Sequence, residues 1–412
     1  MLNKRFFFIL THMTSQELRQ KFIEFFKSKG HVAVPSSSLI PDDLSVLLTT
    51  AGMQQFKKYF TGEKDAGQDF GSKNTTSIQK CFRTVDIDEV GDESHDTFFE
   101  MLGNFSFGGY FKKEAIEYAH EFLVKELGLE IDYVTVFKGD GEVPSDSEAE
   151  EIWKSLGITD IRKLGREDNF WGPTGSEGPC GPTAEIFVKG LKSEVWNLVF
   201  NQFYSKGGKL EPLKSKGVDT GMGMERLTTV VQGKTNIFET DLFAPLIEIQ
   251  PVETPLRIKR ILADHARATA FLISDGVRPS NKEAGYILRR LLRRMIVHGK
   301  DLEKLFEVVV KNYKAAYPEL ELDLILNEFK KENEKFQKTL AGGLKELNKL
   351  QTIDAPRAFK LFETYGLPFE VIKELGGEKA KDISRADFEK EFAKHQEISR
   401  AGAEKKFGGQ KN

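Results

Sequence analysis

Cysteine is scarce in this 412-residue chain, which contains only Cys81 and Cys180. Two cysteines exclude a disulfide framework and do not supply a cysteine-built zinc cluster, so we expect no zinc. This usage fits a reducing cytoplasm best. Long apolar runs are also lacking. None approaches the roughly 18 residues that a membrane-spanning helix requires, so we expect no membrane contact.

Net charge is nearly absent as well, because 60 Lys and Arg residues stand against 63 Asp and Glu residues, giving −3. A uniformly basic coat for binding nucleic acid is therefore excluded, and only local charge could serve that purpose. What is present is the balance of a globular protein, with 39% hydrophobic and 30% charged residues. The length suggests two or three domains with sizeable cores.

The two ends lack the patterns of folded elements. Residues 1–12 carry a basic pair followed by FFFIL, which is shorter than the roughly 7–15 apolar residues of a secretory signal. We expect a disordered tail over 1–12 and a domain that begins near Met13. The polar residues 406–412 predict a second disordered tail.

Strand patterns cluster in the first half of the chain. A capping box formed by Thr14 and Glu17 predicts the start of an amphipathic helix that ends at Gly30. Residues 75–110 predict two strands joined by an acidic loop. AEIFVKG and EVWNLVFNQFY alternate apolar and polar residues, as in a half-solvated antiparallel sheet. We further expect strands within 32–41 and 133–139, a short strand and turn over LLTTAGMQQF (47–56), and a helix over 148–157.

The character of the sequence changes to helical periodicity after Pro251 and Pro255. The expected helices cover 259–274, 283–298, 301–316, 322–349 and 384–400. The predicted fold class is therefore α+β: an antiparallel β-sheet flanked by helices over 13–250, followed by an all-helical domain over 251–405.

One constellation that carries chemistry is TSIQKCFRTV, followed by an acidic loop and FFEMLGNFSFGGYF. Arg83 would stand at the end of a strand on the floor of a cleft, where its planar fork can hold a phosphate and a carboxylate together. A surface arginine is the alternative interpretation. His95 in the loop is expected to be solvated or structural rather than a base.

A second constellation is VDTGMGMERL at 218–227. Gly221 and Gly223 allow close approach to a flat ligand, and Arg226 falls on the helix that would follow them. Asp219 is in a position to receive an ammonium group. The GxGxxR spacing and the lack of a βαβ unit argue against a dinucleotide-binding fold.

Together, and in this order, the two constellations resemble motifs 2 and 3 of class II aminoacyl-tRNA synthetases. Other strings resemble the alanyl-tRNA synthetase family within that class: TTAGMQQF, TFFEMLGNFSFG, NFWGPTG, GPCGPTAEIF, VWNLVFNQF, VDTGMGMER and GYILRRLLRR. The resemblance runs from about Thr14 to about Phe407 and covers the catalytic and tRNA-recognition portions. It implies a class II sheet that activates L-alanine with ATP and Mg²⁺ and then transfers alanine to the 3′ end of tRNA(Ala).

The resemblance also implies a role for each matching residue. Arg83 would bridge the ATP α-phosphate and the alanine carboxylate, Arg226 would contact the γ-phosphate, and Asp219 would pair with the alanine ammonium. The remaining matches line the alanine pocket (Trp171, Asn197, Val199) or contact the nucleotide (Phe98, Phe99, Glu100, Gly221, Gly223). The metal ligands stay open.

The helical half carries a local basic excess, with eleven Lys and Arg residues against three acidic residues in 257–300. Arg289 and Arg293, like Arg290 and Arg294, are spaced i, i+4 on one helical face, which suits phosphate contacts. The alternative is a solvated helix whose arginines brace the domain interface.

Two departures from the family concern RNA and the acidic loop. The family reads a G·U wobble pair in the acceptor stem through an asparagine, matched by Asn281, and an aspartate, replaced here by Glu363. The extra methylene leaves recognition of that pair open. Between Thr84 and Leu102 the chain has seven acidic residues and no Lys or Arg. We expect those acids to face solvent rather than to hold Mg²⁺.

Several alternatives remain at this stage. The family's editing domain is not matched, so we expect that editing resides in a separate chain, that this chain is a fragment, or that the enzyme tolerates error. The family's C-terminal dimerisation elements are not matched either, so we expect a monomer. A rival enzyme is a synthetase paralogue that loads a non-tRNA acceptor. A rival of another class is a catalytically inactive RNA-binding protein.

Overall fold

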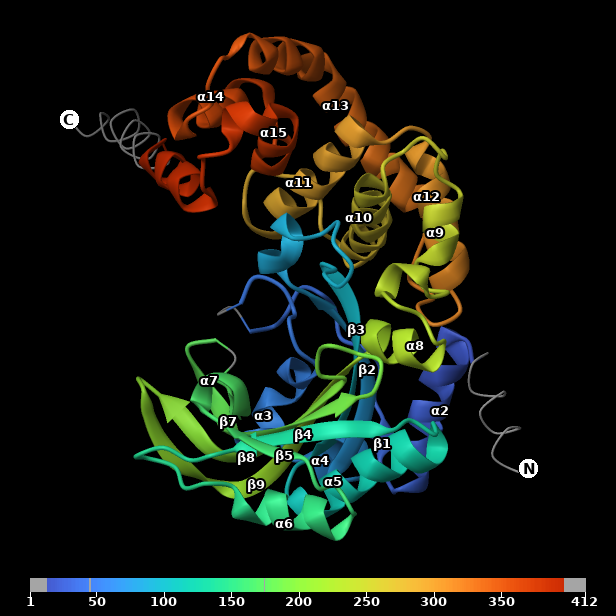
Figure 1. The fold of residues 1–412 in the computed structure, drawn as a ribbon, viewed down its shortest axis with the longest axis vertical. Coiled ribbons are helices and arrows are strands. Elements are labelled where there is room, and N and C mark those ends of the chain that lie inside the picture. The colour runs from blue at the N-terminus through green and yellow to red at the C-terminus, as the bar shows by residue number, and fades with distance from the viewer. Residues whose placement is uncertain (1–12, 44–45, 174, 396–412) are drawn as a thin grey trace, which may run out of the picture.

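The computed structural model describes residues 13–43, 46–173 and 175–395. The tails predicted over 1–12 and 406–412, and the end of the helix predicted over 384–400, lie outside these residues. A sheet-containing portion and a helical portion lie at opposite ends of the long axis (Figure 1). None of the helices in the described ranges is long and apolar enough to cross a membrane.

A mixed nine-stranded sheet forms the first portion, in the order β1-β2-β3-β9-β8-β7-β4-β5, with β6 paired to β7 outside this path. Only the β1/β2 and β4/β5 pairs are parallel. The predicted antiparallel centre of the sheet is confirmed. The strands are β1 (Val32–Ala33), β2 (Asn74–Phe82), β3 (Phe98–Ser106), β4 (Ile131–Phe137), β5 (Ile161–Leu164), β6 (Phe170–Trp171), β7 (Glu177–Val188), β8 (Trp196–Lys206) and β9 (Lys209–Gly223).

The predicted entry helix is α2 (Ser15–Ser28), and its capping box between Thr14 and Glu17 is confirmed. Its phenylalanines pack against the sheet through Trp196. The other elements of this portion are η1 (Gly52–Phe56), α3 (Lys57–Phe60), α4 (Ala66–Phe70), η2 (Thr84–Asp88), α5 (Lys112–His120), η3 (Glu121–Glu126), α6 (Ser147–Ser155), α7 (Arg166–Asn169), α8 (Met224–Val231), η4 (Ile237–Glu239) and α9 (Ala244–Glu248).

The strand and turn predicted over 47–56 is wrong, because η1 and α3 occupy the end of this stretch and the residues that follow it. The side chain of Gln54 turns back and its Oε1 accepts the backbone N–H of Ala51 at 3.0 Å. A side chain that caps its own segment competes with strand pairing, and apolar alternation does not reveal such a cap.

The helical portion contains α10 (Leu256–Ser274), α11 (Glu283–His298), α12 (Leu302–Tyr313), α13 (Leu322–Lys349), α14 (Ala355–Tyr365), α15 (Phe369–Gly376) and η5 (Gly377–Ala380). Residues 385–395 are also helical. Four of the predicted helices match α10 to α13. The sequence prediction missed α14 and α15, which are separated by Gly366 in the left-handed conformation (φ +74°).

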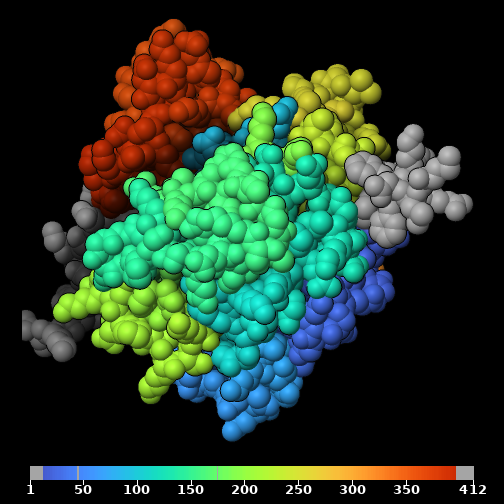
Figure 2. Space-filling view, turned by 60° about the horizontal axis from the view of Figure 1, so that its bottom comes forward, coloured from blue at the N-terminus to red at the C-terminus, as the bar shows by residue number. Residues whose placement is uncertain are grey.

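The core continues across the change in composition at Pro251. The Phe98 ring on β3 stacks on Phe271 of α10 with centroids 4.1 Å apart. One cluster of buried side chains includes residues of both portions. The division at 250/251 therefore stays a proposal about composition and secondary structure, not about separate cores. Figure 2 shows the green-to-cyan part of the sheet portion forming one face, with the red helices standing beyond it.

Candidate active site

A cavity of about 370 Å³ lies beside the central strands β3, β8 and β9 and the loop that follows β2. The hydrogen-bonded register sets β9 between β3 and β8 at the cavity. Nine of the residues singled out from the sequence line this one cavity: Arg83, Phe99, Trp171, Asn197, Val199, Asp219, Gly221, Gly223 and Arg226. Side chains separated by up to 143 positions thus converge.

Asp219 lies on β9 opposite Val199 of β8 and is only 5% exposed. Burial raises the pKa of its carboxyl group to about 7. No hydrogen bond or ion pair to its side chain is found among the residues that the structure describes. A buried carboxylate without a partner is costly unless a cation supplies the missing contact. Asp219 is therefore suited to bind an ammonium group.

The strand period of two places Asp219, Gly221 and Gly223 on the same face of β9. A Cβ atom at residue 221 would lie 2.8 Å from the sulfur of Met101 on β3, so any other residue would force that side chain to move. The two glycines keep the cavity open beside Asp219, as a flat ligand requires.

Arg83 directly follows β2, where its backbone N–H donates to the Thr97 carbonyl at 2.9 Å. Its guanidinium carbon lies 4.8 Å from the centroid of the Phe99 ring, and the side chain is exposed. Within the described ranges no carboxylate forms an ion pair with it. The ring orients the guanidinium by a cation–π contact and leaves its donors available to an anionic ligand.

Arg226 stands in the first turn of α8, and Glu194 holds it from the turn before β8. The guanidinium donates to the Glu194 carboxylate and, at 3.0 Å, to its backbone carbonyl. The side chain is 36% exposed, so it still faces the cavity. An incoming phosphate would share or replace Glu194. No motif marked this glutamate in the sequence.

The expectation that Phe98, Phe99 and Glu100 all face the nucleotide needs correction. Strand alternation turns only Phe99 and its second neighbour Met101 toward the cavity. Phe98 stacks on Phe271, as described above. Glu100 is fully buried on the opposite face, where it accepts Arg19 Nε at 2.8 Å and the Tyr317 hydroxyl at 2.7 Å.

The expectation that the acids after Arg83 face solvent is confirmed for Glu89, Asp92 and Glu93 and needs correction for the others. Asp86 and Asp96 line the cavity instead of facing solvent, and Asp88 pairs with Arg385. Burial and the nearby Glu225 carboxylate raise the pKa of Asp96 well above its usual value. His95 lines the cavity mouth and pairs with Asp92 at 2.5 Å.

A second cavity, here called the groove, has a volume of about 1210 Å³ and lies between α11, α13, α14 and residues 385–395. Five residues expected to bind tRNA line it: Asn281, Arg289, Arg290, Arg293 and Glu363. The Asn281 side-chain oxygen accepts a hydrogen bond from Arg289. Glu363 forms an ion pair with His395 at 2.6 Å.

The arginines of α11 are largely engaged within the chain. Arg293 Nε donates to Glu332 at 2.8 Å, and Arg289 lies 3.1 Å from the same carboxylate. Arg290 pairs with Glu370. Arg294 is 1% exposed and does not line the groove, so its expected contact with tRNA is corrected. For Arg294 the alternative interpretation, a brace between portions, is the right one.

Within the described ranges no group of three or more His, Cys, Asp or Glu side chains could hold a metal ion by itself. Mg²⁺ that accompanies a nucleotide usually takes one or two carboxylates together with phosphate oxygens. Asp96 fits this requirement, because its Oδ2 is buried and has no hydrogen-bond partner in the described structure.

Residues 17–412 match the family described as tRNA synthetases class II (A). Among curated relatives, the alanine–tRNA ligase of Borrelia hermsii is 44% identical, over 96% of this chain and 75% of the relative. That of Treponema denticola is 43% identical over 97% and 74%. That of Rubrobacter xylanophilus is 40% identical over 96% and 51%.

The chain thus spans about three quarters of the first two relatives and about half of the third. Among solved structures it is similar to an aspartyl tRNA synthetase from Entamoeba histolytica at 15% identity, covering 58% of this chain and 57% of that one. The TM-score is 0.34, which is too low to bear on the site.

Proposed function

Because the chain belongs to the class II (A) tRNA synthetases, we propose that it is an alanine–tRNA ligase, which activates L-alanine with ATP and transfers it to the 3′ end of tRNA(Ala). The observation that carries this proposal is the convergence of Arg83, Asp219 and Arg226 on one cavity. Two cations, and one carboxylate that has no ionic partner among the described residues, match the charges of a nucleoside triphosphate and of an amino acid ammonium.

The alanine pocket would be formed around Asp219 by Trp171, Asn197 and Val199. Asp219 binds the ammonium group, while the neutral side chains limit the space for the amino acid side chain. A pocket for one methyl group gains only about 1–3 kcal/mol over glycine, and it rejects serine poorly. High selectivity for alanine over serine and glycine therefore requires a second step outside this pocket, such as hydrolysis of the wrong product.

In the activation step, an alanine carboxylate oxygen forms a bond to the α-phosphorus of ATP. The bond from that phosphorus to the bridging oxygen breaks, and pyrophosphate leaves. Arg83 holds the two anionic reactants together, and Arg226 binds the leaving phosphates. No protein nucleophile is required, since positioning and charge stabilisation carry the step.

Mg²⁺ would be held by Asp96 and phosphate oxygens, and when bound it neutralises part of the phosphate charge. In the transfer step, a ribose hydroxyl of the tRNA attacks the alanyl carbonyl and AMP leaves. The groove would receive the acceptor stem, with Asn281 and Glu363 facing its base edges.

Alanine-dependent exchange of pyrophosphate into ATP tests the activation step. We expect exchange in the wild type, and its absence would favour an inactive RNA-binding protein. Charging of a tRNA that carries the G·U pair, but not of one with G·C in its place, supports tRNA(Ala) as the acceptor. Exchange without any charging would favour a paralogue with another acceptor.

Whether editing comes from a separate chain and whether the chain is a monomer stay predictions. Charging with alanine, serine and glycine side by side tests the first, since stable Ser-tRNA would indicate that this chain does not edit. Light scattering tests the second.

A further inference from the structure

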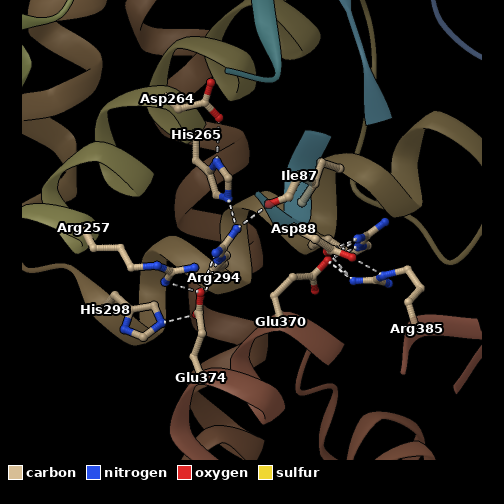
Figure 3. Close-up of polar contacts among 11 residues, drawn as sticks. Ile87, Asp88, Arg257, Asp264, His265, Arg294, His298, Glu370, Glu374 and Arg385 are labelled. Atoms are coloured by element: carbon tan, nitrogen blue, oxygen red, sulfur yellow. Dashed lines mark hydrogen bonds and ion pairs between the residues drawn. The ribbon is translucent and has the colours of Figure 1, made fainter. Parts of the chain in front are cut away.

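The turn η2 begins immediately after Arg83, and two groups of charged side chains from the helical portion hold its last two residues (Figure 3). One group binds the backbone carbonyl of Ile87, and the other binds the carboxylate of Asp88. The residues that make these contacts are Arg290, Arg294, Glu370 and Arg385. Ile87 itself is fully buried, so the turn is held by packing as well as by charge.

The Asp88 contact has the geometry of a bidentate pair. Arg385 Nε lies 2.6 Å from Asp88 Oδ2, and its Nη2 lies 2.6 Å from Oδ1. Nη2 also donates to Glu370 at 2.7 Å. Arg290 pairs with that same Glu370 carboxylate, which is 5% exposed. The two guanidinium groups hold the pKa of Glu370 far below its usual value against the effect of burial.

The Ile87 contact comes from Arg294, whose Nη1 donates to the Ile87 carbonyl at 2.8 Å. Glu374 holds this arginine from the other side and is itself contacted by Arg257 at 3.0 Å and His298 at 2.8 Å. The turn after Arg83 is therefore contacted from α11 and from the helical residues 385–395, and two glutamates of α15 hold the contacting arginines.

Two of these elements, α11 and the residues 385–395, also line the groove. Arg290 lines it, and the helix that starts with Arg385 contributes Phe392 and His395 to its lining. One end of this helix thus faces the proposed RNA site, and the other end fixes the loop of the proposed ATP site. Arg385 itself lines neither cavity, so we expect no direct contact with either substrate.

We propose that Arg385 is a positioning residue for the activation step: through Asp88 it fixes the turn that orients Arg83 toward ATP. This inference rests on the proposed function, because it assigns the effect to ATP. Loss of a hydrogen bond between charged groups would misplace Arg83 and raise the KM for ATP about tenfold. The KM for alanine would change less, since Asp219 is held on the sheet.

The test compares R385Q with the wild type in alanine-dependent pyrophosphate exchange, using the full chain. Rates are divided by the concentration of active enzyme, which is determined by active-site titration. We expect a KM for ATP about tenfold higher in R385Q and in D88N, with a double variant no worse than either single one, because both remove the same contact. R385K keeps the charge, so its KM for ATP should lie between that of R385Q and that of the wild type. R357Q is the matched control, since Arg357 also pairs with an aspartate, Asp354, but touches neither cavity.

Hydrogen exchange of the amides in 84–97 gives a readout that needs no catalysis. We expect faster exchange in R385Q and D88N than in R357Q. An unchanged KM for ATP, a fall in kcat alone, or loop exchange equal to that of R357Q would overturn the inference. Absence of alanine-dependent exchange in the wild type would instead overturn the proposed function, and the amide measurement would still decide whether Arg385 holds the loop.

Discussion

The cavity lined by Arg83, Asp219 and Arg226, here called the cleft, and the groove both contain charged side chains. They differ in whether those charges have ion-pair partners. In the cleft, Arg83 and Asp219 have no ion-pair partner in the described part of the chain, and only Arg226 is paired, with Glu194. In the groove, Arg289, Arg290 and Arg293 already bind carboxylates. Unpartnered charges beside a cavity point to a ligand, whereas paired ones stabilise the fold first and contact RNA only in addition.

The largest effect should come from the paired side. Replacing Arg294 by alanine leaves Glu374 without its buried partner and should lower the free energy of unfolding by about 3–5 kcal/mol. Denaturant unfolding followed by circular dichroism measures it, with R357Q as an exposed control expected within about 0.5 kcal/mol of wild type. An R294A protein that is as stable as wild type but fails to charge tRNA would break the comparison.

The unpartnered side should show the opposite pattern. R83A should cut alanine-dependent pyrophosphate exchange by at least about 100-fold, because it removes a charged contact to the reacting groups. D219A should do the same. Neither change should lower the unfolding midpoint as R294A does, since neither side chain has an ionic partner to lose among the described residues. Near-normal exchange in either variant would contradict the roles assigned here.

The motif spacing predicted this cleft well, because strand alternation and short motifs fix which residues share a face. It did not separate Phe99 from Phe98 and Glu100, for which the face of β3 had to be known. Glu194 lies in no motif. Arg385 meets Asp88 across 297 positions, and no local pattern reports such a contact.

The fold was predictable where helices were long and strands alternated. α14 and α15 are short, and only Gly366 and the following Pro368 mark their junction. The i, i+4 spacing of Arg290 and Arg294 correctly placed both on one helical face. Spacing alone could not tell that this face turns toward η2 and α15 rather than toward solvent.

A third effect concerns pH. Asp219 must be ionised to bind an ammonium group, and burial raises its pKa to about 7. As the pH falls through 7 the carboxylate takes up a proton, so kcat/KM for alanine should fall about tenfold between pH 8 and pH 6. The residual activity of D219N should not follow this profile. A wild-type profile that stays flat down to pH 5 would exclude an elevated pKa at this residue.

The smallest effect sharpens the comparison inside the groove. Lys335 lines the groove and has no ion pair within the described ranges, so it resembles the cleft charges more than its arginine neighbours do. K335Q should weaken tRNA binding about threefold. It should also reduce the slope of log binding constant against log salt concentration by about the amount that one phosphate contact contributes. K331Q is the control, because Lys331 pairs with Glu328 outside the groove. Equal binding by both variants would remove Lys335 from the RNA surface.

The hydrogen bond from Arg294 to Ile87 ends on a peptide oxygen and not on a side chain. Every residue type has a backbone carbonyl, so this acceptor does not depend on the side chain at position 87. It depends on where residue 87 lies along the chain. An extra residue between positions 83 and 87 would move the accepting oxygen by about 2 Å along the turn and by about a third of a turn around it, and would leave the guanidinium facing the wrong peptide. The chain length between 83 and 87 is therefore constrained by this hydrogen bond in addition to the constraints on the Arg83 and Ile87 side chains.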